Sequence, residues 1–250
     1  TRRSSDLIEQ GSPRSKNVEI EGTEPYIVGG HAAAGFWIST GRQTTISGLF
    51  AAGDAAGGCP QKYVTGAMAE ADIASESILK YISSADDSLT KNNLDLTITA
   101  QKYLKQETQF LTSAPDIVLA EDIEEAMQKV MDNYAGGIKT NYKYNEAGLA
   151  IAAEEIARLN ILADDLHADS MHELLFIHEL KDRLTICAFL IKHMLARKET
   201  RWHSFAENLD YPEKDDRNFN KYVNSRLENG EIKIIIRDLV TGGEKYEHSN

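Results

Sequence analysis

The chain has 250 residues, of which 42% are hydrophobic and 26% charged, and its formal net charge is −12. This length suits one large domain or two modest ones, and the excess of acid argues against nucleic acid and anionic membrane surfaces as partners. No apolar run reaches the roughly 18 residues that a membrane-spanning helix needs, so no direct membrane insertion is expected.

The two cysteines, Cys59 and Cys187, are too few for a disulfide framework or for a cysteine-ligated metal or cluster. We therefore expect a reducing, cytoplasmic setting and no metal site. The first residues, 1–5, have neither an initiator Met nor a following apolar stretch. They are interpreted as a break inside a longer chain and not as a signal peptide.

Residues 18–58 are rich in glycine and alanine. The stretch 46–54, ISGLFAAGD, predicts a short buried strand that ends in a glycine and an acid. A glycine-rich turn follows. A helix is then predicted over 65–82, with its apolar side chains facing inward: Met68, Ile73, Ile78 and Leu79. Strand, turn and helix in this order are typical of a nucleotide-binding α/β layer.

From residue 83 the pattern becomes helical. Apolar residues at 3.6-residue spacing predict four helices, at 89–111, 115–134, 146–162 and 170–195. One face of the third helix carries Leu149, Ala152, Ile156 and Leu159. These helices predict an antiparallel bundle with an acidic exterior. The strand pattern of 231–240, preceded by Asn229-Gly230, predicts a terminal β-hairpin.

The turn at the end of the predicted strand has the residue types of a cofactor site. The Asp54 carboxylate can accept hydrogen bonds from ligand hydroxyls, and Gly53 lets the backbone approach a ligand closely. The helix that follows would direct the backbone N–H groups of Gly66, Ala67 and Met68 at an electron-rich edge. A strand-to-helix turn without a ligand explains the same pattern about equally well.

Residues 44–54, TTISGLFAAGD, resemble the second FAD motif of the succinate dehydrogenase and fumarate reductase flavoproteins. The resemblance implies that FAD is the cofactor, that Gly53 and Asp54 lie at its linker region, and that the backbone of residues 66–68 lies beside the isoalloxazine ring. The predicted fold class is α+β: a partial FAD-binding α/β layer, then an antiparallel helical bundle and a terminal β-hairpin. The expected domains are 1–82, with a loop or capping-domain remnant at 1–30, then 83–212 and 213–250.

The substrate side distinguishes two branches of this family. The dicarboxylate enzymes carry a histidine and an arginine at two positions where this chain has Pro25 and Lys62. A lysine point charge does not replace an arginine fork for two-point recognition of a carboxylate. Four stretches resemble adenylylsulfate reductase alpha subunits instead: TEPYIVGGH at 23–31, QKYVTGAMAEA at 61–71, ETRW at 199–202 and DDRNF at 215–219. Gly30 and Gln61 depart from that pattern, which has serine and histidine there.

The resemblance implies two catalytic positions. His31 would bind a sulfite or sulfate oxygen or move a proton, and Lys62 would stabilise negative charge on the substrate or the reduced flavin. Without the resemblance, we would interpret His31 as a loop histidine and Lys62 as a solvated surface lysine. Arg201 is expected in a structural ion pair that braces the helical domain against the flavin domain. The helical histidines lack the spacing of a zinc helix and are expected to be solvated or capping: His167, His172, His178 and His193.

No Gly-x-Gly-x-x-Gly follows a predicted strand in this sequence. We therefore predict that this chain alone neither retains FAD tightly nor turns over. The resemblance implies that the full subunit acts on a small anionic substrate, adenylylsulfate or sulfite with AMP. It also implies electron exchange with a ferredoxin-like iron–sulfur subunit. Two alternatives stay open: a fumarate reductase or succinate dehydrogenase flavoprotein, and a non-catalytic helical interaction module.

Overall fold

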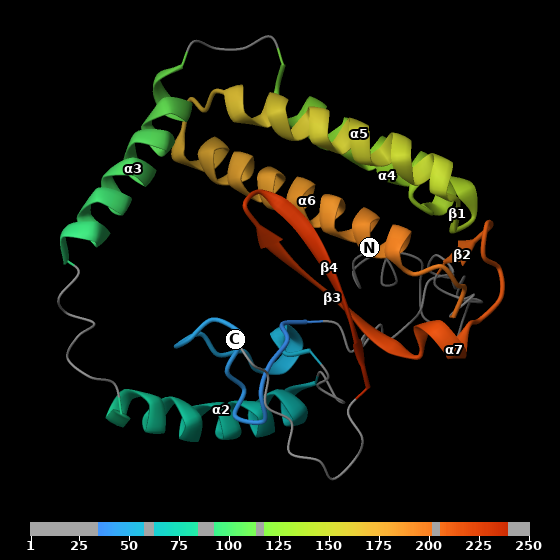
Figure 1. Ribbon diagram of the computed structural model, residues 1–250. Helices are drawn as coiled ribbons and strands as arrows, with labels where there is room; N and C mark the ends of the chain where they lie inside the picture. Colours follow the sequence, from blue (N-terminus) through green and yellow to red (C-terminus); the bar gives the residue numbers. More distant parts are fainter. Residues whose placement is uncertain (1–34, 58–62, 85–92, 114–117, 202–205, 240–250) are drawn as a thin grey trace, which may run out of the picture. The chain divides into compact units, whose positions relative to one another are not determined.

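The computed structural model describes residues 35–57, 63–84, 93–113, 118–201 and 206–239. Three helices in the second half pack side by side (Figure 1): α4 (Ala120–Tyr134), α5 (Glu146–Leu162) and α6 (Met171–Ala196). Short connections between successive helices make neighbours antiparallel, as the sequence predicted.

The ends of these helices are set by local hydrogen bonds. The Asn145 side chain accepts from the Gly148 backbone N–H at 2.7 Å and begins α5 at the predicted residue. Ser170 caps α6 in the same way, through the Glu173 N–H at 3.2 Å. Gly136, with φ +77°, follows the end of α4, where the left-handed conformation favours glycine. The predicted start of this helix, Pro115, lies outside the described residues.

The core lies between α4, α5 and α6. The face of α5 that the sequence predicted, Leu149, Ala152, Ile156 and Leu159, is fully buried. From α6 it meets Leu174, Ile177, Leu180, Leu184 and Ile191, and from α4 it meets Ile123 and Met127. Helix α3 (Asn93–Thr112) joins this core at its C-terminal end through Phe110, whose backbone carbonyl accepts from the Ala168 N–H at 2.9 Å.

The terminal hairpin is confirmed. Strand β3 (Lys221–Glu228) pairs antiparallel with β4 (Glu231–Asp238), with Asn229 and Gly230 at φ +50° and +81° in the turn between them. This is the conformation that favours Asn-Gly in a two-residue hairpin. Both strands pack against α6. A second, short pairing joins β1 (Lys143–Tyr144) in parallel to β2 (Glu207–Asn208).

The first part of the described chain differs from the prediction. Residues 46–49 form a turn, closed by the Leu49 N–H on the Ile46 carbonyl at 3.1 Å, and not a buried strand. Ile46 is 63% exposed. Thr44 explains the turn locally, because its hydroxyl accepts from the Ile46 N–H at 3.1 Å. Within residues 35–57 the backbone makes only isolated bridges, so the α/β layer itself remains a prediction.

Helix α2 (Val64–Ser84) is present where it was predicted, but the predicted inward face is wrong. Met68 and Leu79 are 65% and 66% exposed, whereas Glu70 and Ala74 are buried. The surface of α2 that packs against the described residues is set by its contacts with η1 (Gly53–Ala55) and the loop before it, and not by its apolar pattern. None of the described helices is long and apolar enough to cross a membrane.

Candidate functional site

The predicted cofactor turn is built from η1 and the first turn of α2. Gly53 has φ +65°, a conformation that a residue with a side chain rarely adopts. Its carbonyl accepts from the Ala56 N–H at 3.0 Å, which closes the tight turn and leaves Asp54 exposed at its centre. A carboxylate on an exposed tight turn is accessible to a ligand hydroxyl.

Gly53 also brings this turn against α2. A Cβ added at Gly53 would lie 3.1 Å from the Ala67 Cβ, closer than nine in ten such contacts. The four predicted FAD-contact residues nearest this contact, Gly53, Asp54, Gly66 and Ala67, are therefore brought together. Met68 follows on the same turn of helix with most of its side chain exposed. The first turn of α2 carries no acidic side chain of its own that would offset the partial positive charge of the helix N-terminus.

The two predicted catalytic residues, His31 and Lys62, lie outside the described residues. The chain that follows His31 is described from Gly35 and is bonded to the Asp54 turn. The Phe36 N–H donates to the Ala55 carbonyl at 2.8 Å, and the Gly57 N–H donates to the Phe36 carbonyl at 2.9 Å. The backbones approach so closely that a Cβ at Gly35 would lie 2.6 Å from the Gly57 nitrogen.

An ion pair that the sequence did not indicate holds this region to α2. Arg42 forms a two-point ion pair with Glu70, in which Nη2 donates to Oε1 at 3.1 Å and Nε donates to Oε2. Glu70 is 8% exposed. From the sequence, a glutamate on a helix is expected to be solvated. Glu70 is buried because the loop around Arg42 packs against it.

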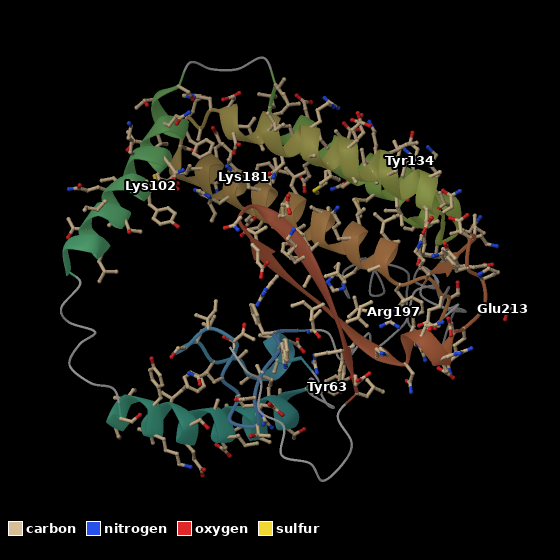
Figure 2. The ribbon with its side chains drawn as sticks, in the orientation of Figure 1. Tyr63, Lys102, Tyr134, Lys181, Arg197 and Glu213 are labelled. Carbon is tan, nitrogen blue, oxygen red and sulfur yellow. The ribbon has the colours of Figure 1, made fainter. Side chains whose placement is uncertain are left out.

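A second charged cluster surrounds Glu199, whose side chain is fully buried (Arg197 of this cluster is labelled in Figure 2). Arg201 donates to both its carboxylate oxygens at 2.8 and 3.0 Å, Arg197 donates at 2.7 Å, and the Asp215 N–H donates at 2.8 Å. Burial alone would raise the pKa of Glu199, but these hydrogen bonds outweigh it and lower that pKa below 4.5. Arg201 also pairs with Asp216 at 2.8 Å.

The ion pair predicted for Arg201 is thus confirmed, and it joins the 199–202 and 215–219 motifs to each other. Neighbouring contacts fasten the same loop to the bundle, because Lys198 pairs with Glu146 at 3.0 Å and the Asp210 carboxylate accepts from the Glu146 N–H at 2.6 Å. These contacts brace the loop against α5. The predicted bracing against the flavin domain stays a prediction.

Three of the four helical histidines join elements, a role that their prediction as solvated or capping residues missed, although the His178 side chain is still 42% exposed. His167 lies 3.3 Å from the Ser113 hydroxyl, His178 lies 2.5 Å from the Glu107 carboxylate, and His193 lies 2.7 Å from the Ser225 hydroxyl. His172 alone is exposed as predicted. Among the described residues, no three His, Cys, Asp or Glu side chains could together hold a metal.

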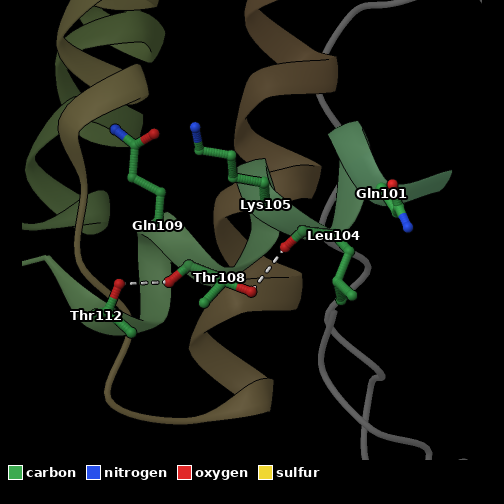
Figure 3. A pocket seen from close by; sticks show the side chains of 6 residues that line it. All are labelled: Gln101, Leu104, Lys105, Thr108, Gln109 and Thr112. Atoms are coloured by element: carbon green, nitrogen blue, oxygen red, sulfur yellow. Dashed lines mark hydrogen bonds between the residues drawn. The ribbon is translucent and has the colours of Figure 1, made fainter. Parts of the chain in front are cut away.

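A shallow groove of about 510 Å³ runs along one face of α3 and is lined by Gln101, Leu104, Lys105, Thr108, Gln109 and Thr112 (Figure 3). Its hydroxyls are engaged within the helix, since Thr108 and Thr112 donate to the carbonyls four residues earlier. The groove shares no residue with the Asp54 turn. We assign it no role in the chemistry.

Residues 124–247 match the model of the fumarate reductase flavoprotein C-terminal domain. This chain contains a C-terminal domain of the fumarate reductase flavoprotein family. The matched region begins in α4 and contains both the Glu199 cluster and the hairpin, so both lie within this domain of the chain. The predicted family resemblance is confirmed.

The chain is also similar to individual proteins of known sequence or structure. The chain is 24% identical to the adenylylsulfate reductase alpha subunit of Megalodesulfovibrio gigas, over 87% of this chain and 37% of that protein. It is 29% identical to an uncharacterised FAD-dependent oxidoreductase of Methanocaldococcus jannaschii, over 76% and 34%. The solved adenylylsulfate reductase of Archaeoglobus fulgidus is 32% identical, with a TM-score of 0.66 over 84% of this chain and 34% of that one. The chain spans about a third of the length of these relatives.

Proposed function

We propose that this chain is the C-terminal part of a flavoprotein subunit of the adenylylsulfate reductase type. The subunit would convert adenylylsulfate into sulfite and AMP with two electrons, or run the reverse reaction. The observation that carries the proposal is the 32% identity to the Archaeoglobus enzyme over 84% of this chain, together with Pro25 and Lys62 at the two dicarboxylate positions.

The described turn fits a flavin. Its backbone approaches α2 without an intervening Cβ, its acid is exposed, and the helix N-terminus beside it carries no competing acid. In the proposal Asp54 accepts hydrogen bonds from FAD hydroxyls, and the backbone of residues 66–68 lies along the ring. FAD, when bound, would supply the two-electron chemistry, and the protein would position an anion against it.

His31 and Lys62 are proposed to hold that anion. A lysine offers a compact positive charge to a sulfite or sulfate oxygen, and an imidazole offers one N–H when neutral and two when protonated. The electrons would be exchanged with an iron–sulfur subunit of the ferredoxin type. The proposal places the subunit in the cytoplasm, in keeping with the two cysteines of this chain.

Fumarate reduction is the second candidate, favoured by the family match of residues 124–247. The two are separated by assaying the full-length subunit with its iron–sulfur partner, using sulfite plus AMP in one arm and fumarate in the other. We expect turnover with sulfite plus AMP. Turnover with fumarate alone would assign the dicarboxylate branch, and turnover with neither would favour the non-catalytic helical module.

Two pairs of variants test the roles proposed for Lys62 and Asp54. Lys62→Ala should lower kcat/KM for sulfite by about tenfold or more, as the loss of a charged hydrogen bond predicts. Lys80→Ala, at an exposed lysine of α2, serves as the matched control and should change nothing.

For the cofactor, Asp54→Asn should weaken FAD binding, whereas Asp72→Asn, at an exposed position of α2, should not. The 250-residue chain should remain colourless when mixed with FAD and desalted, and a stoichiometric yellow complex would contradict that expectation.

A further inference from the structure

Arg42, in the loop before the Asp54 turn, has a backbone conformation that side chains disfavour. Its φ is +70°, in the left-handed region that a residue with a Cβ rarely adopts. Two backbone hydrogen bonds hold it there: the Arg42 N–H donates to the Ser39 carbonyl at 3.0 Å, and the Arg42 carbonyl accepts from the Ala51 N–H at 3.0 Å. Residues in such conformations persist only where several contacts fix them, and they are concentrated at functional sites. The contacts of the Arg42 side chain indicate what this conformation serves.

The Arg42 guanidinium donates through all three of its nitrogens. Nη2 donates to Oε1 of Glu70 at 3.1 Å, Nε donates to Oε2 of the same carboxylate, and Nη1 donates to the Thr40 carbonyl. The Arg42 and Glu70 side chains are 19% and 10% exposed. A two-point pair fixes orientation as well as distance, because the two planar groups must meet edge to edge. The pair therefore sets both how close α2 lies to the loop and how the helix is rotated about its axis.

Glu70 lies on the face of α2 that meets the cofactor turn. It follows Ala67 by three residues, and residues at this spacing share one face of a helix. Ala67 is the residue that Gly53 approaches, and Ala74, four residues after Glu70, is buried. The first turns of α2 are thus held at two successive points, by the Gly53 contact and by the ion pair.

The Arg42 backbone is tied to the residues that lead into the Asp54 turn. Its carbonyl bonds to Ala51, three residues before Asp54, and its neighbour Gln43 forms a bridge with Phe50. Arg42 therefore connects the chain that enters the turn, through its backbone, with the helix that follows the turn, through its side chain.

We propose that Arg42 and Glu70 are positioning residues for the flavin, which hold the first turn of α2 in place against the Asp54 turn. This inference rests on the FAD-binding part of the proposed function, because it takes Asp54 and the backbone of residues 66–68 as FAD contacts. A helix N-terminus acts on a ligand only over its first turn, so a small displacement or rotation of α2 weakens that contact. Neither Arg42 nor Glu70 touches FAD or the substrate in this proposal.

The first test measures the FAD dissociation constant of the full-length subunit, by titrating the apoprotein and following flavin fluorescence. Arg42→Gly removes the side chain and introduces a residue that adopts the left-handed backbone freely, and it should raise that constant about tenfold. Glu70→Gln should do the same. The double variant should bind FAD no more weakly than either single variant, because both changes break one contact. Arg42→Lys keeps the charge and loses the fork, so it should recover part of the affinity.

Two control variants separate positioning from general stability. Arg158 on α5 makes a pair of the same kind with Glu155 at 2.8 Å, with side chains 57% and 36% exposed, and Arg158→Lys should leave FAD binding unchanged. Leu180→Ala weakens the fully buried core of the bundle and should also leave the FAD dissociation constant of the folded subunit unchanged. An equal rise for Leu180→Ala and Arg42→Gly would show general destabilisation and would overturn the proposal.

The midpoint potential of the bound flavin gives a readout that a merely structural pair would not move. The N–H groups of a helix N-terminus stabilise the reduced flavin more than the oxidised one, because the ring gains negative charge on reduction. A loosened α2 should therefore lower the potential. Arg42→Lys is the variant to measure, since it leaves the formal charge unchanged, and Arg158→Lys is its control. Equal potentials for Arg42→Lys and the unmodified subunit would overturn the proposal.

The outcomes distinguish this inference from the proposed function. FAD binding is measured without substrate, so an unmodified subunit that binds FAD but does not turn over sulfite plus AMP would refute the proposed reaction alone. An unmodified subunit that binds no FAD would refute the cofactor part of the proposed function, and this inference with it. FAD binding that is equally tight in the unmodified subunit, Arg42→Gly and Glu70→Gln would refute only the role of the pair.

Discussion

Glu199 and Arg201, two residues apart in the chain, form a two-point ion pair in which one carboxylate is entirely buried. The same carboxylate also accepts from Arg197 and from the Asp215 backbone. Since four hydrogen bonds converge on one side chain, Glu199 ties Arg197 and Arg201 to the Asp215 backbone. A charge buried without such partners would be strongly destabilising.

Removing this charge should therefore be costly. Glu199→Gln replaces an acceptor oxygen with an amide that faces arginine donors, and we expect the free energy of unfolding to fall by about 3 kcal/mol. Urea denaturation measures it. Glu125→Gln removes an exposed partner of Lys129 on α4 and should cost less than about 0.5 kcal/mol. Equal losses for the two variants would show that burial of Glu199 contributes nothing.

The half-buried His193 should make stability depend on pH. Burial and the neighbouring Arg197 lower the pKa of His193 below its usual 6.5. The folded state therefore resists protonation, and the contribution of neutral His193 is complete above pH 6.5 and is lost as pH falls through the lowered pKa. The pKa of Glu199 is also lowered, from 4.5, so the stability that its ionised carboxylate contributes is present above pH 4.5. It is lost as pH falls through the lowered pKa, in a more acidic range than that of His193.

The measurement is urea denaturation of the unmodified chain and of His193→Gln at a series of pH values from about 7.5 to about 5. Stability of the unmodified chain should fall more steeply over this range than that of the variant. His172→Gln, at an exposed position of α6, should leave the slope unchanged. A parallel decline for the unmodified chain and His193→Gln would show that His193 titrates alike in both states.

Gly53 and Gly230 form a natural pair for testing the contact under the cofactor turn. Both have left-handed backbones, but a Cβ at Gly230 meets nothing within 4 Å, whereas one at Gly53 meets Ala67 at 3.1 Å. Each change to alanine should cost about 1 kcal/mol for the backbone alone. Gly53→Ala should cost more by the amount of the clash, and Ala67→Gly should recover that excess in a double-mutant cycle. Identical losses at the two sites would argue against the η1–α2 contact.

The bundle core should behave as a close-packed interior. Leu180 on α6 is 0% exposed, so Leu180→Ala should lower the free energy of unfolding by about 3 kcal/mol through lost burial and the cavity left behind. Leu175 on the same helix is 56% exposed, and Leu175→Ala should cost well under about 1 kcal/mol. Thermal unfolding of the two variants compares them directly, and a similar shift for both would contradict the assigned core face.

The predictions made from the sequence were more accurate for the helical bundle than for the first part of the chain. Helix α5 begins and ends at the predicted residues, because its cap at Asn145 and its apolar face are both local signals. Helix α2 was predicted in place but with the wrong face, since Met68 is exposed and Glu70 is buried. The stretch 46–54 was predicted as a strand from its apolar content, but residues 46–49 form a turn, because a strand is stable only where another strand pairs with it.

The sequence by itself determined the helices of the bundle, the Asn-Gly hairpin and the family, because caps, 3.6-residue spacing and turn residues act over a few neighbours. Only the tertiary structure decided that Arg42 lies on Glu70, 28 residues away, and that Arg237 stacks on Trp37 from the far end of the chain. Charged and aromatic side chains of this kind have no preferred partner in sequence. Which of them meet depends on how the backbone brings distant segments together, and the burial of one charge is favourable only once its partner has arrived.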